Sequence, residues 1–394
     1  MLIDVSRLIW RGWSGRLPTG IDRVCLAYLA RFGEGARAVI QWNGRRIVLA
    51  AIDSRRLTAV LLAGGPRFRG RLVAVLGRAL AGAVAARPRR GQFYLNIGHT
   101  GLDDPGLSRW IGRHGLRAIH LVHDLIPIET PEFCRPGEAG KHVRRMTNAL
   151  ESASGIIVNS QATRDALCAF AERRRLPCPP MVVAWLAGHA LPAATPPEPP
   201  PSSSAGNRPY FVVVGTIERR KNHILLLRLW KRLAERMGED APRLLLVGQR
   251  GWEAQEALAM LDRCAARDMV VELGRCGDDE LARLLSGARA LLMPSFAEGF
   301  GLPVIEALRT GTPVIASDLA VFHEIAGDIP TYLSPFDGAA WERAVVDFCG
   351  PSPERLRQAA AMRGYRAPDW PGHFARVERW LDTLPPASRQ DQGS

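Results

Sequence analysis

The sequence contains no apolar stretch long enough to cross a membrane. A transmembrane helix needs roughly 18 to 20 consecutive uncharged residues, and Arg or Lys interrupts every candidate run in this chain of 394 residues. Residues Met1–Val5 enter a strand-like run at once and lack the basic start, apolar core and cleavage site of a signal peptide. We therefore expect a cytoplasmic protein without an export signal. A peripheral position on the inner face of the plasma membrane is compatible with this expectation.

The sequence also lacks the spacings of disulfide frameworks and metal sites. Its seven cysteines are scattered, odd in number and without a Cys-x-x-Cys pair, as is typical of reduced residues in a cytoplasmic protein. Among nine histidines only His120 and His123 are close, and an offset of three places them on opposite faces of a strand. We expect no protein-borne metal site.

Motifs of kinases, dehydrogenases and nucleic-acid-binding proteins are missing as well. The chain has no internal repeat, no Gly-x-x-x-x-Gly-Lys-Ser/Thr phosphate loop and no Gly-x-Gly-x-x-Gly after the first strand. The formal charge of +13 suits a nucleic-acid partner, but the arginines are spread along the chain without interleaved aromatic stacking motifs. We expect no nucleic-acid partner.

The densest basic region, residues 67–90, encloses the apolar runs Leu72–Leu76 and Ala79–Ala81. Such a segment can rest on an anionic membrane surface. The same pattern is typical of a core helix with snorkelling arginines at its ends. Both interpretations remain open at this point.

A segment rich in proline and serine, residues 191–209, divides the chain nearly in half and cannot form a packed element. On both sides of it, short apolar runs alternate with helical stretches, which favours parallel sheets covered by helices. Because ligands of such sheets bind beyond the carboxyl ends of the strands, we expect a shared site in the cleft between the halves.

The most informative stretch is residues 294–308, which sets Glu298 and Glu306 eight positions apart around a glycine turn. Apolar residues 290–293 predict a buried strand, and the turn opens a helix. A strand that runs into a glycine turn and then a helix presents free N–H groups and a positive dipole end to an anion. The segment 301–304 is therefore predicted to hold a diphosphate, although Pro303 offers no N–H.

Glu298, Phe300, Gly301 and Glu306 resemble the Glu-x-Phe-Gly-x-x-x-x-Glu signature of the retaining GT-B glycosyltransferases of family 4. The resemblance implies an α/β fold of two Rossmann-like domains whose parallel sheets face a central cleft. It also implies a nucleotide-sugar donor as co-substrate, with no metal and no other cofactor.

The resemblance assigns residues 1–190 to an acceptor-side domain and 191–209 to the linker. It assigns residues 210–365 to the donor-binding domain and 366–394 to a helix that crosses back to the first domain, followed by a loose tail. In the second domain it implies that Glu306 binds the ribose and that Glu298 lies near the transferred sugar. The amides predicted to hold the diphosphate are those of Gly301, Leu302 and Val304.

Other segments supply further residues. The run from Phe211 to His223 resembles the family segment that binds the donor diphosphate, with Lys221 the best match and Arg220 a second cation. Thr216 stands where many members carry arginine, and backbone contacts to the base are expected near Arg275. Each segment also has a purely structural interpretation. Arg220 and Lys221 can belong to a solvated turn before a helix, and the acidic residues after Arg275 can cap a helix.

In the first half, the segment 12–24 contains a Gly-Ile-x-Arg motif that begins at Gly20. It resembles the family loop whose amides approach the donor phosphate. The resemblance implies that the phosphate closely approaches Gly20. The family often has a histidine after the strand that His123 follows, so His123 is expected to contact the transferred sugar. Alternatively, Thr19 caps an ordinary helix and His123 is structural.

The resemblance implies a retaining enzyme that moves a hexose to a hydroxyl of a polysaccharide or a lipid-linked glycan. GDP-mannose is the first donor to consider, because the segment Gly215-Thr216-Ile217-Glu218 is similar to that of mannosyl and rhamnosyl enzymes. The alternatives are a nucleotide-sugar epimerase or hydrolase on the same fold, and a non-catalytic carbohydrate-binding subunit.

Overall fold

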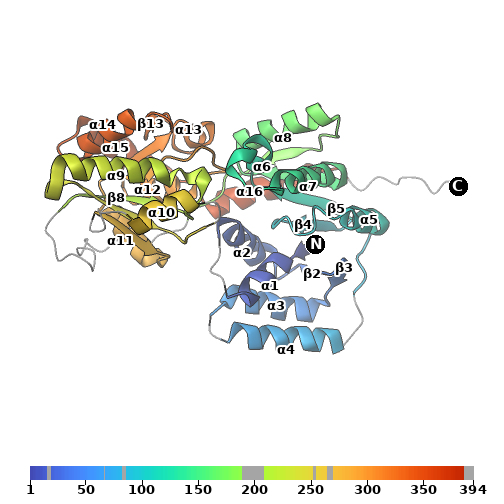
Figure 1. Cartoon of the computed structure of the whole chain (residues 1–394). Coiled ribbons are helices and arrows are strands. Elements are labelled where there is room, and N and C mark those ends of the chain that lie inside the picture. The colour runs from blue at the N-terminus through green and yellow to red at the C-terminus, as the bar shows by residue number, and fades with distance from the viewer. Residues whose placement is uncertain are drawn as a thin grey trace. The chain divides into compact units, whose positions relative to one another are not determined.

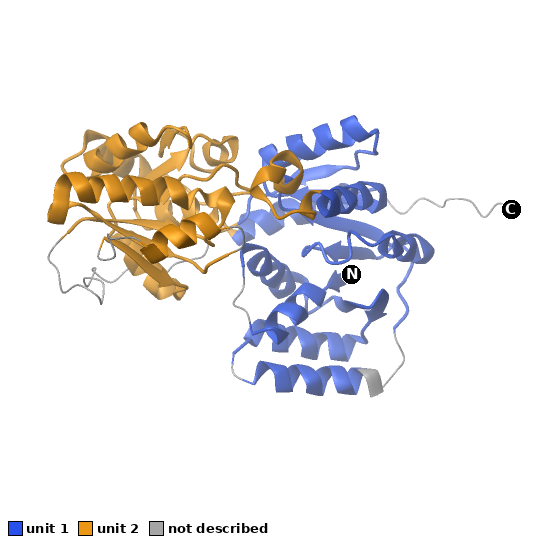
Figure 2. Ribbon diagram, viewed as in Figure 1, with its two compact units in different colours: residues 1–125, 140–186, 370–394 blue, residues 126–139, 187–369 orange. Residues whose placement is uncertain are grey.

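The computed structural model describes residues 1–15, 19–65, 67–81, 86–188, 208–251, 254–263 and 269–385 (Figure 1). The chain divides into two compact units (Figure 2). Unit 1 comprises Met1–Leu125, Gly140–Leu186 and Trp370–Ser394, and unit 2 comprises Ile126–Ala139 and Ala187–Asp369. Most of the predicted linker, residues 191–207, lies outside the described residues.

Unit 1 contains a seven-stranded sheet in the order β3-β2-β1-β4-β5-β6-β7. All neighbours are parallel except β2 and β3, which are antiparallel. Asn43 and Gly44 both have positive φ, 47° and 73°, as a two-residue hairpin turn requires. The strands are β1 (Leu2–Asp4), β2 (Arg37–Trp42), β3 (Arg45–Val48), β4 (Phe93–Asn96), β5 (Arg117–Val122), β6 (Ala153–Val158) and β7 (Met181–Val183).

Helices flank the sheet of unit 1 (Figure 1). They are α1 (Ser6–Trp13), α2 (Gly20–Phe32), α3 (Ala51–Ala63), α4 (Phe68–Ala81), α5 (Pro105–His114), α7 (Glu138–Ser152), α8 (Gln161–Arg174) and α16 (Trp370–Thr383). No helix in the described ranges has the length and apolar character that a bilayer-spanning segment requires.

Unit 2 contains a six-stranded, entirely parallel sheet in the order β10-β9-β8-β11-β12-β13. This is the doubly wound order. The chain adds β9 and β10 on one side of β8 and then adds β11, β12 and β13 on the other side, so the order of strand addition reverses between β8 and β11. Ligands of such sheets bind beyond the carboxyl ends of the strands at this switch point. The strands are β8 (Tyr210–Val214), β9 (Arg243–Val247), β10 (Val270–Gly274), β11 (Leu291–Met293), β12 (Val314–Ser317) and β13 (Thr331–Leu333).

The helices of unit 2 follow its strands in alternation, as the sequence predicted. They are α6 (Ile126–Glu129), α9 (His223–Met237), α10 (Gln255–Arg263), α11 (Asp278–Ser286), α12 (Leu302–Arg309), α13 (Ala320–Ala326), α14 (Gly338–Cys349) and α15 (Pro353–Met362), with 3₁₀ turns η1 (Pro131–Phe133), η2 (Arg219–Lys221) and η3 (Gly238–Asp240). Both units are thus Rossmann-like α/β domains, in which helices alternate with the strands of a largely or entirely parallel sheet. The predicted fold class is confirmed.

The core of unit 2 holds the central strand β8 in place. Phe211 of β8 and Trp230 of α9 are fully buried and meet edge to face, with ring centroids 5.8 Å apart. The Trp230 indole N–H donates to the Pro242 carbonyl at 2.8 Å, so this large ring is buried without an unsatisfied donor. The carboxyl end of β8 therefore starts from a rigid base.

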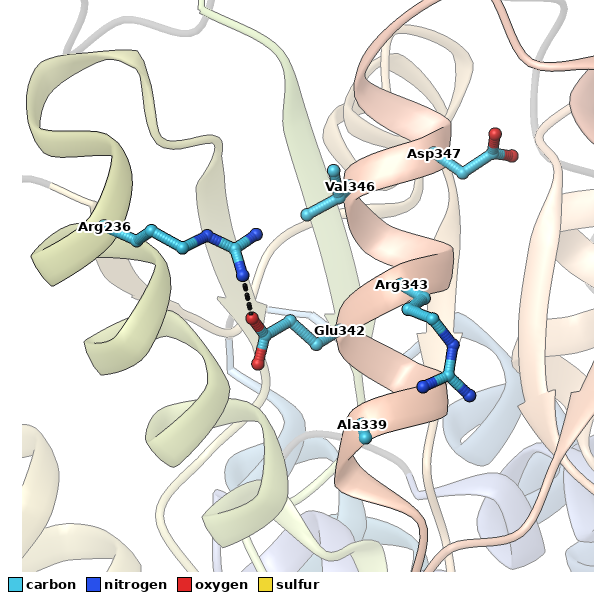
Figure 3. Close-up of a pocket in the computed structure, with 6 residues that line it drawn as sticks. All are labelled: Arg236, Ala339, Glu342, Arg343, Val346 and Asp347. Atoms are coloured by element: carbon cyan, nitrogen blue, oxygen red, sulfur yellow. Dashed lines mark hydrogen bonds and ion pairs between the residues drawn. The ribbon is translucent and has the colours of Figure 1, made fainter.

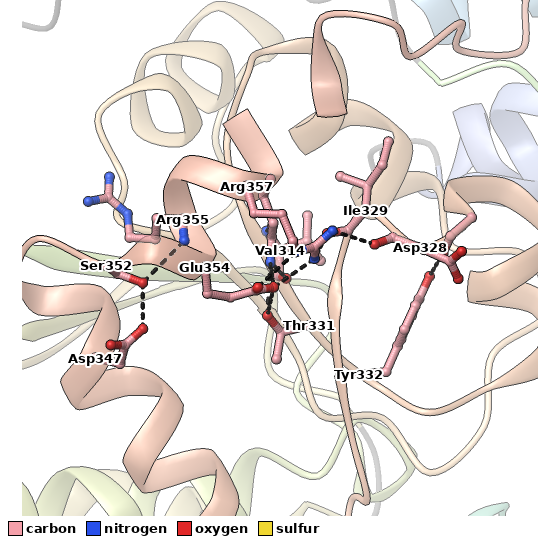
Figure 4. A network of polar contacts seen from close by, with 12 residues as sticks. Val314, Asp328, Ile329, Thr331, Tyr332, Asp347, Ser352, Glu354, Arg355 and Arg357 are labelled. Atoms are coloured by element: carbon pink, nitrogen blue, oxygen red, sulfur yellow. Dashed lines mark hydrogen bonds and ion pairs between the residues drawn. The ribbon is translucent and has the colours of Figure 1, made fainter. Parts of the chain in front are cut away.

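Polar contacts fasten α15 to the sheet edge of unit 2 (Figure 4). Gln358 is completely buried, and its amide both accepts from Val314 N at 2.8 Å and donates to Val314 O at 3.1 Å. Glu354 accepts from the Thr331 hydroxyl at 2.7 Å and from Arg357. These bonds satisfy the buried amide and link α15 to β12 and β13.

The end of the chain packs on unit 1. Phe374 of α16 is buried, and its ring centroid lies 5.1 Å from that of Tyr28 in α2. The Tyr28 hydroxyl lies 2.8 Å from His373 Nε2. Helix α16 is thus grouped with the N-terminal residues, starting at Trp370 instead of residue 366.

An excursion within the first half differs from the predicted domain 1–190. Residues Ile126–Ala139 are grouped with unit 2, and the first unit otherwise ends at Leu186. Phe133 stacks on Phe296 with ring centroids 4.5 Å apart and planes 4° from parallel. Aromatic stacking over this area holds the excursion against unit 2, a long-range contact that local sequence patterns do not predict.

Two glycines let β8 and β9 end close together. A Cβ on Gly248 would lie 1.9 Å from the Gly215 carbonyl oxygen, and a Cβ on Gly215 would lie 3.2 Å from Lys221 Cε. Their φ angles of +159° and +143° also disfavour a side chain. Glycine at these positions lets the Lys221 stem cross the end of β8.

We expect Gly248→Ala to lower the free energy of unfolding by about 1–3 kcal/mol, the usual cost of overpacking. Gly350→Ala is the control, because a Cβ there meets open space at a negative φ of −107°. Urea unfolding of both variants measures the effect. A change in Gly248→Ala no larger than about 0.5 kcal/mol, the usual range for surface positions, would contradict the close approach.

Candidate active site

Two cations hold one carboxylate at the switch point of unit 2. Glu298 Oε1 accepts from Lys221 Nζ at 2.5 Å and from Ser295 Oγ at 2.6 Å. Glu298 Oε2 accepts from Arg220 Nη1 at 2.9 Å. The structure thus brings together three residues that the sequence singled out, together with one that it did not.

The two loops that carry these groups follow neighbouring strands. Arg220 and Lys221 lie in η2 after β8, and Glu298 lies in the loop after β11. Phe296 N donates to Arg220 O at 2.9 Å, and Arg220 Nη1 also donates to Ala297 O at 2.7 Å. Main-chain and side-chain bonds together therefore fix one loop against the other.

Burial and charge act in opposite directions on Glu298. Its side chain is only 7% exposed, and that of Lys221 is 11% exposed. Burial raises the pKa of Glu298, but the charges of Lys221 and Arg220 and the hydrogen bonds outweigh it and lower the pKa to about 2. Burial lowers the pKa of Lys221, while the charge of Glu298 opposes that change.

Glu298 is consequently ionised at neutral pH and is not suited to donate a proton. Arg220 Nη2 also lies 3.6 Å from Glu218 Oε2, so the two cations face two carboxylates, of which Glu298 is the nearer and the more buried. Preorganised, partly buried cations of this kind can stabilise negative charge that develops on a leaving diphosphate. Glu298 holds the two cations in place.

The start of α12 offers fewer amides than the sequence predicted. Gly301 is the N-cap with φ +102°, and a Cβ there would lie 2.7 Å from the Phe322 ring. Val304 N already donates to Gly301 O at 3.0 Å, and Pro303 has no N–H. Among Leu302, Pro303 and Val304, the first is thus the residue whose N–H is open to an anion.

Glu306 lies in α12 and is 4% exposed. A Cβ on Gly188 would lie 3.4 Å from Glu306 Cγ, so the chain at residue 188 passes directly beside this helix. Thr216 follows β8, and Arg275 follows β10. All the sites predicted in unit 2 therefore follow the carboxyl ends of its parallel strands or lie in the helix that comes next. Their ligands remain predictions.

In unit 1, the ring of the predicted residue His123 lies beside that of His99, a histidine that the sequence did not single out. His123 Nε2 donates to Ile97 O, and His99 Nε2 donates to Leu121 O, each at 2.8 Å. The ring centroids are 5.1 Å apart. Burial lowers the pKa of His123 to about 4, so the ring is neutral at pH 7 and its Nε2 carries the hydrogen. Nδ1 is therefore the ring nitrogen with a lone pair that can accept a hydrogen bond.

Gly20 is the exposed first residue of α2, and Thr19 caps this helix. Thr19 N and Oγ1 both donate to Asp22 Oδ2, at 2.7 and 2.6 Å. The cap that the sequence allowed is therefore present, and it is compatible with the phosphate role predicted for Gly20.

Sequence reasoning missed Ser295, His99 and the partners of Asp22. Ser295 had a usable signal, because a hydroxyl three residues before a carboxylate at a strand end can bond to it. His99 has φ +61°, which no local pattern predicted. Among the described residues, no group of three or more His, Cys, Asp or Glu side chains has a metal-binding arrangement.

A hollow of about 490 Å³ between α9 and α14 is lined by Arg236, Ala339, Glu342, Arg343, Val346 and Asp347 (Figure 3). Arg236 and Arg232 bind Glu342 there, at 2.6 and 2.9 Å. These residues lie within α9 and α14 and not in the loops after β8 and β11 that carry the candidate site, so the hollow is separate from it.

Glu298→Gln tests the charge of the cluster. The lowered pKa means that the ionised carboxylate stabilises the fold above its ordinary pKa of 4.5, and that this contribution is lost as the pH falls toward about 2. We expect the wild type to be more stable than the variant at neutral pH, with a difference that shrinks over this interval. Denaturant unfolding measured across the interval checks it.

Glu235→Gln is the control for this experiment, because Glu235 is 64% exposed and 3.9 Å from Lys231. We expect this change to leave the pH dependence of unfolding nearly as in the wild type. A wild-type advantage over Glu298→Gln that stays constant down to pH 2 would show that the carboxylate is not held by the two cations.

Comparison with known proteins gives the family context of this geometry. Residues 196–339 match the family model described as "Glycosyl transferases group 1". The chain is 28% identical over 256 residues to O-antigen chain mannosyltransferase B of Escherichia coli, covering 63% of this chain and 65% of that protein. It is 32% identical over 231 residues to the serotype-specific mannosyltransferase WbdA of Escherichia coli, covering 56% of this chain and 28% of that protein.

The match thus spans less than two thirds of the length of either relative. Among solved structures, HepE of Anabaena in complex with UDP has a TM-score of 0.64 at 15% identity, covering 97% of this chain and 99% of that chain. At this identity the likeness is one of fold. Residues 196–339 therefore resemble a glycosyl transferases group 1 domain, the chain is similar in sequence to mannosyltransferases, and its fold is that of the GT-B glycosyltransferases.

Proposed function

We propose that the protein is a retaining glycosyltransferase that moves a hexose from a nucleotide-diphosphate sugar to a hydroxyl of a glycan. The observation that carries the proposal is the cluster of Lys221, Arg220 and Glu298 at the switch point of a doubly wound sheet. Such a point is where nucleotides bind in this class of sheet. The family match of the surrounding residues supports the same function.

In the proposed reaction, Lys221 and Arg220 bind the donor diphosphate together with the N–H of Leu302. The anomeric bond breaks, and the electron pair stays on the diphosphate oxygen, whose new charge the cations stabilise. The acceptor hydroxyl attacks on the same face of the sugar and passes its proton to the departing diphosphate. Glu306 holds the ribose, and no side-chain nucleophile or metal takes part.

For the donor we propose GDP-mannose, and for the acceptor a surface polysaccharide or its lipid-linked precursor. Two relatives are mannosyltransferases by name, and one of them is named for the O-antigen chain. The segment Gly215–Glu218, which includes Thr216, is similar to that of mannosyl and rhamnosyl enzymes. The site lies on the cytoplasmic side in this proposal.

The test is a transfer assay with purified full-length protein, GDP-mannose and an oligosaccharide acceptor. We expect the mannose to appear on the acceptor with retained anomeric configuration and GDP to be released in equal amount. Release of GDP without acceptor would indicate a hydrolase, and an altered sugar without a second sugar would indicate an epimerase. Glycan binding without turnover of any nucleotide sugar would indicate a non-catalytic subunit.

Lys221→Gln and Glu306→Gln test the donor contacts. Each change removes a charge-assisted contact of about 1.5–3 kcal/mol, so we expect the Kd of GDP to rise at least about tenfold. Calorimetric titration with GDP measures this. Lys231→Gln is the control, because Lys231 is 71% exposed and pairs only loosely with Glu235, at 3.9 Å. An unchanged Kd in both site variants would remove these assignments.

We also propose that unit 1 makes peripheral contact with an anionic membrane through α1 and α4. Trp10 and Trp13 are 52% and 44% exposed, and Val73 is 54% exposed. Arg69 joins the two helices by donating to Trp13 O at 2.8 Å. Residues 67–90 contain no Asp or Glu, and interfacial Trp with Arg is the composition that suits a bilayer surface.

Trp10→Ala combined with Trp13→Ala tests this contact. We expect the double variant to lose most of its binding to phosphatidylglycerol vesicles, and the wild type to bind phosphatidylcholine vesicles weakly, because the arginines need anionic lipid. Co-sedimentation measures both. Trp42→Ala is the control, since Trp42 is equally accessible at 56%. Equal binding by the double variant and the control would contradict the proposal.

A further inference from the structure

Unit 1 contains a second carboxylate held by two cations. Asp22 is completely buried. Arg7 Nε lies 2.7 Å from Asp22 Oδ1, and Arg11 Nε lies 2.8 Å from Asp22 Oδ2. Thr19 adds its two donors to Oδ2 from the start of α2. The carboxylate thus accepts hydrogen bonds from Arg7 and Thr19 and forms a further ion pair with Arg11.

This cluster lies at the switch point of the sheet in unit 1. Helix α1 follows β1 directly, and Arg7 and Arg11 are four residues apart on one face of it. A Cβ on Gly98, just beyond the end of β4, would lie 2.8 Å from Arg7 Cδ. Strands β1 and β4 are neighbours, and the chain direction across the sheet reverses between them. This is the place where doubly wound sheets bind their ligands.

The cluster has one positive charge more than Asp22 requires. Burial raises the pKa of Asp22, but hydrogen bonds from Thr19 and the charge of Arg7 outweigh it, so the pKa is lowered and the group is ionised. One guanidinium neutralises this carboxylate, and the second is surplus. In the described part of the chain, Asp22 is the side chain that both guanidiniums contact.

Among the described residues, no ion pair or hydrogen bond engages the terminal nitrogens of either guanidinium, which leaves them to a ligand. The contacts to Asp22 use Nε of each arginine, and the side chains are 32% and 20% exposed. A planar guanidinium whose Nε is engaged still offers four N–H donors on its two terminal nitrogens, in a geometry that matches phosphate oxygens. Because a buried carboxylate orients both forks, their rotamer freedom is already reduced before a ligand arrives.

We propose that Arg7 and Arg11 form a phosphate-binding site in unit 1, oriented by Asp22. The ligand is a phosphate or diphosphate group of a substrate of the proposed glycosyl transfer, and in naming that source the inference rests on the proposed function. Two sources present this chemistry, namely the donor diphosphate and a phosphate that links the acceptor glycan to its carrier. Asp22 is a positioning residue in this scheme.

Arg7→Gln and Arg11→Gln, made singly, test the site, since each leaves one cation on Asp22. The probes are inorganic pyrophosphate and GDP by calorimetry, and two acceptors in initial-rate assays. One acceptor is a polyprenyl-diphosphate-linked oligosaccharide, and the other is the same oligosaccharide on an uncharged alkyl chain. Arg31→Gln is the matched control, because Arg31 lies in α2 and pairs at the surface with Glu378.

If the donor is the source, we expect both variants to raise the Kd of GDP at least about tenfold. If the acceptor is the source, GDP binding stays as in the wild type. In that case KM rises at least about tenfold for the diphosphate-linked acceptor alone, and KM for the alkyl acceptor is unchanged. GDP affinity and both KM values within twofold of the wild type would overturn the proposal.

The pyrophosphate titration separates this inference from the proposed function. If no transfer is found with any donor, weaker pyrophosphate binding in both variants still supports the site, and unchanged binding overturns it. Should a Gln variant fold poorly, Arg7→Lys and Arg11→Lys keep the charge beside Asp22 but lose the planar fork. We expect these variants to unfold like the wild type and to show a smaller loss of affinity in the same direction, and wild-type affinity in them would count against the site.

Discussion

Unit 2 depends on one electrostatic constraint, a nearly buried carboxylate that must be matched by cations. Glu298 is ionised because Lys221 and Arg220 surround it, and removing one partner of such a buried group typically costs about 3–5 kcal/mol. The cations and the carboxylate come from loops after different strands. Satisfying the charge therefore locks these two loops together at the place where the sheet reverses its winding.

Unit 1 meets the same constraint by another route. There the carboxylate comes from the first turn of α2 and both cations come from α1, so two helices supply the groups that strand-end loops supply in unit 2. In unit 1 two cations surround one carboxylate, which leaves a positive excess beyond the carboxyl ends of the strands, whereas in unit 2 Glu218 lies 3.6 Å from Arg220 as a second carboxylate. Substrates with a diphosphate group suit both surfaces.

The sequence indicated most of what depends on short-range order. Apolar runs predicted the strands of both sheets except β3 and β13, and the glycine at position 301 predicted the turn before α12, where φ is +102°. The dipeptide Asn43-Gly44 is a typical hairpin turn and indicated an antiparallel pair at this place. The expectation of parallel sheets did not include that pair. The occupied amide of Val304 was not foreseen, because the backbone bond that takes it depends on how the first turn closes.

The sequence by itself determined the alternation of strands and helices, and hence the class of fold and the edge of each sheet where functional residues gather. Only the tertiary structure decided the partners. Glu298 meets Lys221 from 77 residues away, Asp22 takes two arginines of α1, and Phe133 packs on Phe296. The reason is physical: periodicity and turn chemistry act over a few residues, whereas ion pairing and stacking depend on which strands become neighbours and on how deeply each group is buried.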